Sequence, residues 1–165
     1  MGKIIRDISI IVVLAIVLAF TYNAFSEKPL PLIPKTQEEM KISEDIFYGD
    51  FTATLESLNE YNVTYGQLKS IIGKEGFIII DARRPEAYAE GHITNAVNIF
   101  PYSENPDDYF GQLVMLPRDK TIIIYCDGGT CDLSHHVAEE LINMGYPKVF
   151  LYRGGWEDWS EKEGN

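Results

Sequence analysis

The sequence is poor in cysteine, and this scarcity limits how the chain can be held together. Its 165 residues include two cysteines, Cys126 and Cys131, which lie close together in one stretch. A single local pair cannot supply the disulfide framework of a small secreted scaffold. A chain of this length can instead form one modest domain around a hydrophobic core, with residues left over for a tail.

Positive charge is also scarce. Lys and Arg number 14 against 25 Asp and Glu, which gives a formal net charge of −11 at pH 7. Proteins that bind nucleic acid cluster Lys and Arg against the phosphates, so this composition argues against nucleic acid as a partner. Small anions remain possible ligands, but backbone amides rather than net charge would have to hold them.

Residues of the kind that bind zinc are few. Cys126, Cys131 and His135 could contribute to a zinc site, since Cys and His are the usual ligands of this ion. Their spacing matches no common zinc motif and a fourth ligand is missing, so we expect no metal. The sequence also contains no internal repeat and no low-complexity tract.

An apolar segment is present at the N-terminus. From Ile8 to Phe25 the chain carries no charge, and a membrane-spanning helix needs about 20 predominantly apolar residues. A cleaved signal peptide would need small residues at positions −3 and −1 of the cut, and a cut after Ala24 places Tyr22 at −3. We therefore expect residues 1–25 to form an uncleaved signal anchor, with a cleaved signal peptide and a secreted or periplasmic body as the alternative.

The charges that flank this segment predict its orientation. Lys3 and Arg6 lie on its short N-terminal side. Because positive flanks stay on the cytoplasmic side, we expect a cytoplasmic N-terminus and a single-pass protein whose body is extracytoplasmic.

The rest of the chain divides into a linker and a domain. Residues 26–61 are expected to be a linker and N-terminal extension, in which three prolines at residues 29, 31 and 34 favour an extended, semi-rigid stalk. Residues 36–61 are expected to be irregular or partly helical. The domain proper is expected at residues 62–162.

Within this domain, short apolar runs alternate with segments of helical spacing. Thr64 and Gln67 have the pattern of a capping box that opens a helix, and Gly145 is expected to end another. Alternation of this kind is typical of a small α/β domain with a parallel sheet and helices on both faces. The sequence predicts strands at residues 77–80, 96–99, 121–125 and 148–151, and helices at residues 65–72, 84–90, 108–113, 133–144 and after residue 155.

One stretch combines a strand, a cysteine and two glycines. The strand at residues 121–125 is followed by Cys126, and Gly128 and Gly129 precede the helix that starts at Leu133. This order collects backbone N–H groups around one point, and the positive local field favours a thiolate. Glycine lets the backbone approach a ligand without a Cβ in the way. Cys126 is therefore the candidate nucleophile, with a buried, inert cysteine as the alternative.

A second polar segment is expected beside this cysteine. Asp81 closes another strand, and ligands of open α/β sheets sit outside the carboxyl ends of the strands, so the two segments should meet at one edge. We expect Asp81 to be structural and to anchor a neighbouring loop through backbone N–H groups. Arg83 or Arg84 either faces the site, where it would attract an anionic donor, or pairs with a glutamate of the following helix.

These residues resemble a known family. Residues 81–99, which include Asp-Ala-Arg-Arg-Pro-Glu and Gly-His-Ile, are similar to the first signature of rhodanese domains. Tyr125-Cys126-x-Gly-Gly and the later Leu151-Tyr-Arg-Gly-Gly resemble the second half. The resemblance covers roughly residues 62–162, and the combined pattern is much more specific than any single motif.

Rhodaneses are sulfurtransferases, so the resemblance implies transfer of sulfane sulfur without a cofactor. By this resemblance, Cys126 accepts sulfur from a small donor such as thiosulfate or a polysulfide, carries it as a persulfide, and yields it to a thiol acceptor or to cyanide. The residues whose amides would cradle the terminal sulfur are Asp127, Gly128, Gly129, Thr130 and Cys131.

The loop also departs from the family pattern. Cys131 stands where many active rhodaneses carry arginine or another polar residue, and Asp127 stands where arginine is common; its negative charge should raise the pKa of Cys126. Three roles are open to Cys131: a resolving thiol, a disulfide partner or a passive loop residue. We favour either a reversible disulfide with Cys126 or attack by Cys131 on a persulfide at Cys126. A disulfide requires a Cα separation of about 4.4 to 6.8 Å. The related Cys-x5-Arg phosphatases are excluded, because Asp132 occupies the arginine position.

The sequence therefore predicts a membrane-anchored, extracytoplasmic sulfurtransferase that acts through a persulfide on Cys126. Two alternatives remain open. The first is a thiol–disulfide redox module in which Cys126 and Cys131 cycle without carrying sulfur. The second is a catalytically silent rhodanese-like domain that binds a partner near the membrane.

Overall fold

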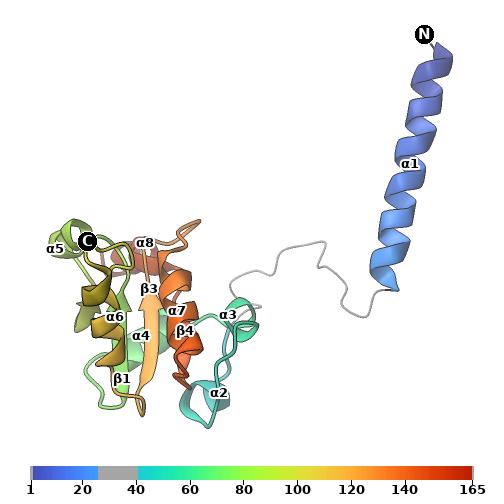
Figure 1. Cartoon of the computed structure of the whole chain (residues 1–165). Helices are drawn as coiled ribbons and strands as arrows, with labels where there is room; N and C mark the ends of the chain where they lie inside the picture. The colour runs from blue at the N-terminus through green and yellow to red at the C-terminus, as the bar shows by residue number, and fades with distance from the viewer. Residues whose placement is uncertain (1, 26–40, 165) are drawn as a thin grey trace. The chain divides into compact units, whose positions relative to one another are not determined.

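The computed structural model describes residues 2–25 and 41–164 (Figure 1). The chain divides into two compact units, residues 1–35 and residues 36–165, and each is described by itself. The proline-containing segment predicted to form a stalk lies outside the described residues.

In the N-terminal unit the structure describes one long helix, α1 (Gly2–Ala24). Its stretch Arg6–Asn23 is long and apolar enough to cross a membrane, although a signal sequence has the same character. Apolar side chains such as Leu18 and Phe20 are 67% and 55% exposed, so no protein core covers them. The expected apolar helix is thus present, and its composition is compatible with either an anchor or a signal sequence.

The C-terminal unit is built on a parallel sheet of four strands. These are β1 (Phe77–Asp81), β2 (Ala96–Asn98), β3 (Thr121–Tyr125) and β4 (Val149–Leu151). Their order is β2-β1-β3-β4 and all neighbours run parallel. The predicted strands are confirmed, each to within one residue at its ends.

The two inner strands are apolar at their centres, residues 78–80 and 122–124, because both faces of the sheet are covered. Successive side chains of a strand point to opposite faces. On β3, Ile122 and Ile124 join one hydrophobic cluster, whereas Ile123 and Tyr125 join the other. A continuous run of β-branched residues is what a strand buried on both sides requires.

Helices on each face complete the two clusters. α6 (Pro106–Val114) and α7 (Leu133–Asn143) contribute Leu113 and Leu141 to the first cluster, while α4 (Tyr65–Ile71) and α8 (Gly155–Glu163) contribute Leu68 and Trp159 to the second. The short α5 (Pro85–Glu90) follows β1. The predicted small α/β domain with a parallel sheet and helices on both faces is confirmed.

Local sequence signals set the helix ends. The Thr64 side chain accepts a hydrogen bond from the Gln67 amide, and the Gln67 side-chain oxygen accepts one from the Thr64 amide, so the predicted capping box is formed. Gly145 adopts a positive φ of 82° directly after the end of α7, in the left-handed conformation that glycine tolerates.

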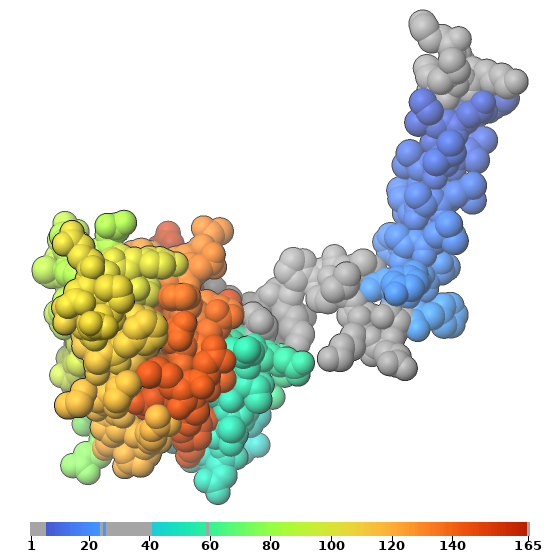
Figure 2. Space-filling view, in the orientation of Figure 1, coloured from blue at the N-terminus to red at the C-terminus, as the bar shows by residue number. Residues whose placement is uncertain are grey.

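The segment that precedes the predicted domain packs onto it. Residues 41–61 contain α2 (Glu44–Tyr48) and α3 (Ser57–Glu60). The sequence predicted an irregular or partly helical segment here. Phe47 joins the core on one face of the sheet and Leu58 the core on the other. The Ala53 amide donates to the Pro147 carbonyl at 2.6 Å, and Figure 2 shows this teal segment against the red-orange end of the domain. The extension is therefore part of the folded unit from residue 41 onward.

Candidate active site

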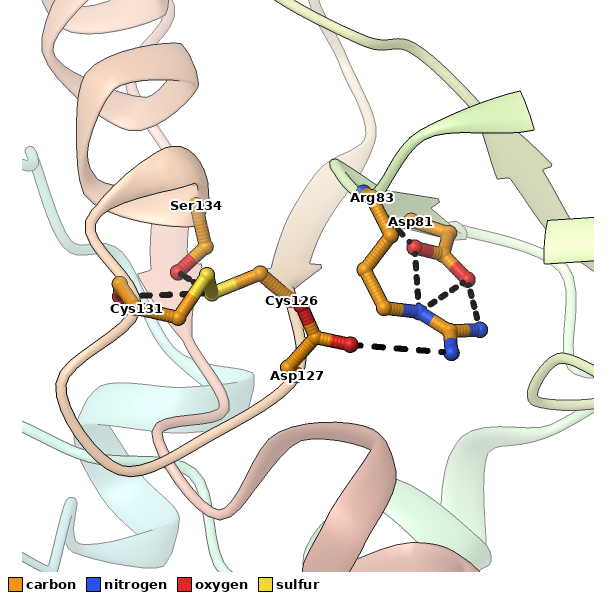
Figure 3. The surroundings of a disulfide bond; sticks show 6 residues. All are labelled: Asp81, Arg83, Cys126, Asp127, Cys131 and Ser134. Carbon is orange, nitrogen blue, oxygen red and sulfur yellow. Dashed lines mark hydrogen bonds and ion pairs between the residues drawn. A yellow bond between two sulfur atoms is a disulfide. The ribbon is translucent and has the colours of Figure 1, made fainter. Parts of the chain in front are cut away.

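The two polar segments meet at the carboxyl edge of the sheet, as the strand pattern predicts. Asp81 is the register partner of Tyr125, the residue before Cys126. Just beyond the strands, the Ala82 amide donates to the Tyr125 carbonyl at 2.9 Å. Figure 3 shows the Asp81 and Arg83 side chains on one side of the cysteine loop.

Asp81 and Arg83 form a buried ion pair beside the cysteine. Their side chains are 0% and 3% exposed, and Arg83 Nη2 lies 2.7 Å from Asp81 Oδ2. Arg83 Nε donates to Asp81 Oδ1 at 3.1 Å, and the Arg83 amide donates to the same oxygen at 2.9 Å. Asp81 thus anchors the following turn through a backbone N–H, as expected. The Tyr125 hydroxyl donates to Asp81 Oδ2 at 2.6 Å and ties this pair to β3.

The charge states of this network follow from burial and pairing. Burial alone would lower the pKa of Arg83, but the hydrogen bonds and charge of Asp81 outweigh it and raise that pKa. Burial, followed by the negative charge of Asp81, raises the pKa of Tyr125 far above its usual range. Arg83 therefore stays charged and Tyr125 stays a neutral hydrogen-bond donor.

Arg83 also reaches the cysteine loop. Its Nη1 lies 3.9 Å from Asp127 Oδ1, and its guanidinium carbon lies 4.8 Å from the centre of the Trp156 ring. The carboxylates that it meets are Asp81 and Asp127 rather than those of the helix α5. Arg84 is exposed and lies over the Phe100 ring, with 5.5 Å from its guanidinium carbon to the ring centre.

The cysteine loop is folded tightly against the start of α8. Gly128 has a φ of 116°, and a Cβ on it would meet the Gly154 carbonyl oxygen at 2.4 Å. Gly155 is restricted in the same way from the other side, because a Cβ on it would lie 2.6 Å from the Cys126 carbonyl oxygen. The Trp156 amide donates to that Cys126 carbonyl at 2.8 Å. Glycines at both positions are required so that the two backbones can touch.

Cys126 and Cys131 are joined by a disulfide in this structure (Figure 3). Their Cα atoms are 6.5 Å apart, which lies within the separation that a disulfide requires. Cys126 is 3% exposed, and its Sγ lies 3.3 Å from the Cys131 carbonyl oxygen. The pairing that the sequence favoured is therefore compatible with the fold.

The amides of the expected cradle are not all directed at the sulfur. The Cys131 amide donates to the Gly128 carbonyl at 3.1 Å and closes a turn within the loop. In this disulfide-bonded form the N–H therefore serves the loop itself. The expected contribution of Cys131 to a ring of amides is not made in this state.

Ser134 is a site residue that the sequence reasoning missed. It lies in the first turn of α7, is 6% exposed, and its Oγ is 3.3 Å from Cys126 Sγ. Cysteine, a glycine loop and a hydroxyl at the start of the next helix are a recognisable signal, but the spacing alone does not show that the hydroxyl faces the sulfur.

The histidines near the loop have other partners. His135 Nδ1 lies 3.5 Å from Glu139 Oε1, and His136 stacks on Tyr102 with ring centres 5.6 Å apart. Among residues 2–25 and 41–164, no group of three or more His, Cys, Asp or Glu side chains is arranged to hold a metal ion.

The fold and site define a small parallel α/β domain that carries a cysteine loop at the carboxyl edge of its sheet. Comparison with known proteins identifies its family. The family model described as rhodanese-like domain matches residues 64–162. This chain belongs to the rhodanese-like domain family.

Named relatives and solved structures agree with this assignment. The thiosulfate sulfurtransferase GlpE of Coxiella burnetii is 30% identical over 94 residues, which span 54% of this chain and 77% of that protein. A putative mitochondrial thiosulfate sulfurtransferase of Schizosaccharomyces pombe is 23% identical over 124 residues, or 70% of this chain and 86% of that protein. The crystal structure of the BH2092 protein from Bacillus halodurans is similar with a TM-score of 0.54 and 32% identity, covering 62% of this chain and 73% of that one.

Proposed function

We propose that this protein is a sulfurtransferase that carries sulfane sulfur as a persulfide on Cys126. The observation that carries the proposal is the position of Cys126: it directly follows the inner strand β3, it opens a glycine loop, and its Sγ lies 3.3 Å from Ser134 Oγ. Membership of a family with relatives named thiosulfate sulfurtransferase supports the same reaction.

The reaction begins with reduction of the disulfide. Two equivalents of an external thiol convert the Cys126–Cys131 disulfide to two thiols and leave as their own disulfide. The Cys126 thiol then loses its proton to solvent. The thiolate is the form that attacks, and a hydrogen bond donated by Ser134 Oγ at the observed separation of 3.3 Å favours that form.

Sulfur transfer then proceeds through two displacements. The Cys126 thiolate attacks the sulfane sulfur of the donor, a new S–S bond forms, and the old one breaks as the donor leaves with the electron pair; thiosulfate leaves as sulfite. The terminal sulfur of the resulting persulfide is negatively charged, and the loop amides that remain free stabilise it. An acceptor thiolate attacks that terminal sulfur, takes it as its own persulfide, and restores the Cys126 thiolate.

The helix α1 is proposed to anchor the sulfurtransferase domain to a membrane. The stretch Arg6–Asn23 has the length and composition to span the bilayer, and Lys3 and Arg6 favour a cytoplasmic N-terminus with the domain on the other side. The intact mass of the protein extracted from membranes tests this proposal. A mature chain that starts near residue 25 would refute the anchor and favour a cleaved signal peptide.

Mass spectrometry of the reduced protein after exposure to thiosulfate or polysulfide tests the sulfurtransferase proposal. We expect a gain of one sulfur atom on Cys126 in the wild type and in Cys131→Ser, and none in Cys126→Ser with the fold retained by circular dichroism. A sulfur atom gained by Cys126→Ser, or no gain by the wild type, would contradict the proposal.

The disulfide favours a second candidate, a thiol–disulfide redox module. In that case Cys126 and Cys131 cycle between dithiol and disulfide, and two electrons and two protons pass to or from an external thiol pair. The same experiment distinguishes the two candidates, since the redox module would lose two protons on oxidation and would not gain sulfur.

A further inference from the structure

Exposed carboxylates surround the cysteine loop. The Asp127 side chain is 65% exposed directly after Cys126, and Asp132 and Glu157 are exposed as well. The Glu157 amide donates to the Asp127 carbonyl at 2.9 Å, which holds the start of α8 beside the loop. We call Asp127, Asp132 and Glu157 the acidic rim.

The arginine nearest to the rim is already paired. Arg83 Nη1 is 3.9 Å from Asp127 Oδ1, while Arg83 Nη2 is 2.7 Å from Asp81 Oδ2. Two carboxylates therefore share one guanidinium, and the group of three retains one negative charge. Because Asp81 is fully buried and holds Arg83 at short range, Asp127 is the carboxylate left incompletely neutralised at the surface.

The cysteine loop and the helix after it, within residues 121–147, carry no Lys or Arg. Arg153 is half-buried and donates to the Leu58 carbonyl at 2.6 Å; burial lowers its pKa, and nearby Asp132 opposes that change. Arg153 therefore acts on the Asp132 end of the rim. Arg84, the exposed cation at the end of β1, lies over Phe100.

We propose that the acidic rim selects sulfur donors by their charge, with Asp127 as the specificity-determining residue. This inference depends on the proposed sulfurtransferase function. A donor must place its sulfane sulfur on Cys126 Sγ, so the rest of the donor lies at the rim. Each extra negative charge on the donor is then repelled by Asp127. Donors with at most one negative charge, such as organic thiosulfonates and singly charged persulfides, are the preferred class over the thiosulfate dianion.

Two donors that undergo the same reaction separate the charge effect from the chemistry. Thiosulfate carries two negative charges and releases sulfite, while methanethiosulfonate carries one and releases methanesulfinate. In both cases the Cys126 thiolate forms a bond to the sulfane sulfur and the donor S–S bond breaks. A change in the pKa of Cys126 affects both rates alike, so the ratio of the two kcat/KM values reports only on charge at the rim.

The experiment measures this ratio, thiosulfate over methanethiosulfonate, for the full chain in detergent with its cysteines reduced. We expect Asp127→Asn to raise the ratio about fivefold and Asp127→Arg to raise it further, because the repulsion between this carboxylate and the extra charge of thiosulfate is removed. Added salt should raise the ratio of the wild type, since ions screen exposed charges, and should have less effect on Asp127→Asn.

Glu75→Gln is the matched control. Glu75 is an exposed carboxylate just before β1, so the whole length of that strand separates it from the carboxyl edge, and its loss should leave the ratio unchanged. Equal ratios for Asp127→Asn and Glu75→Gln, or a wild-type ratio that does not respond to salt, would overturn the selection by charge. A wild type that takes sulfur from neither donor would overturn the proposed function itself.

Discussion

Two neighbouring strands of this domain end side by side in opposite ways. β1 ends at Asp81, which is fully buried and bound by Arg83 and by the Tyr125 hydroxyl. β3 ends at Tyr125 and is followed by Cys126, from which an exposed loop with two positive-φ glycines leads to Cys131. The end of β1 is held by several hydrogen bonds, whereas β3 leads into the disulfide-bonded cysteine loop.

The difference shows how a strand end that is held by side-chain hydrogen bonds lies beside one that leads into a loop. Tyr125 connects the two strand ends. Its hydroxyl donates to Asp81, and its backbone leads directly into Cys126. Tyr125 also accepts the Ile93 amide at 3.0 Å. These two hydrogen bonds hold the end of β3, the strand that leads into the cysteine loop.

The largest effect is expected at the end of β1. Asp81→Asn removes the charge that pairs with Arg83 and leaves that guanidinium buried, so we expect a loss of about 3–5 kcal/mol in the free energy of unfolding. Chemical denaturation measures the loss. Asp119→Asn, at an exposed position, is the control and should change stability little. A similar loss for both variants would mean that the buried pair has no special structural role.

A smaller loss of stability is expected at the loop. In Gly128→Ala the new Cβ would meet the Gly154 carbonyl at 2.4 Å in a backbone conformation with φ 116°, and we expect a loss of about 2–4 kcal/mol. Gly129→Ala is the matched control. Its φ is 57° with no atom within 4 Å of the added Cβ, so the cost should be about 1–2 kcal/mol. Thermal unfolding would show equal losses if the contact with α8 were unimportant.

Ser134→Ala should change reactivity rather than stability. Loss of a hydroxyl 3.3 Å from Cys126 Sγ removes a donor to the thiolate and should raise the pKa of Cys126. We expect alkylation at neutral pH to slow about fivefold, which corresponds to about 1 kcal/mol for one hydrogen bond. The pH profile of alkylation in a Cys131→Ser background measures this. Ser134→Thr keeps the hydroxyl and should restore the profile; a profile unchanged in Ser134→Ala would remove Ser134 from the site.

The smallest effect is expected far from both strand ends, at the exposed pair Lys69–Glu163. A hydrogen bond from Lys69 Nζ, at 2.6 Å, is the main cause that lowers the pKa of Glu163 and raises that of Lys69 to about 12. The pKa of Glu163 is lower in the folded than in the unfolded state. The stability that this carboxylate contributes is therefore fully present above the unfolded pKa and is lost as the pH falls through the folded pKa. The Lys69 contribution is lost as pH rises through about 12.

Glu163→Gln should therefore differ from the wild type in stability at neutral pH but not in strong acid. Salt should reduce even this difference, because the pair is exposed. Unfolding followed at several pH values and two salt concentrations measures it. A difference that persists at low pH would show that the packing of Glu163, and not its charge, is responsible.

Local patterns in the sequence were sufficient for the elements and for the main candidate residues. The four strands, the capping box of Thr64 and Gln67, and the meeting of Asp81 with the cysteine loop were all predicted. Each depends on residues within one short segment or on the general rule that parallel strands end at one edge. The structure confirms them for that reason.

The partners across the fold were decided by tertiary structure alone. The contacts of Arg83 with Asp127, of Ser134 with Cys126, and of Gly128 with Gly154 join residues from separate parts of the chain. Spacing along the chain cannot specify such contacts, since they depend on how the helices pack on the sheet. The sequence by itself determined a rhodanese-like domain with a cysteine at a strand end. Packing decided which charge and which hydroxyl stand beside the sulfur, because those groups meet only when the sheet and its helices close around them.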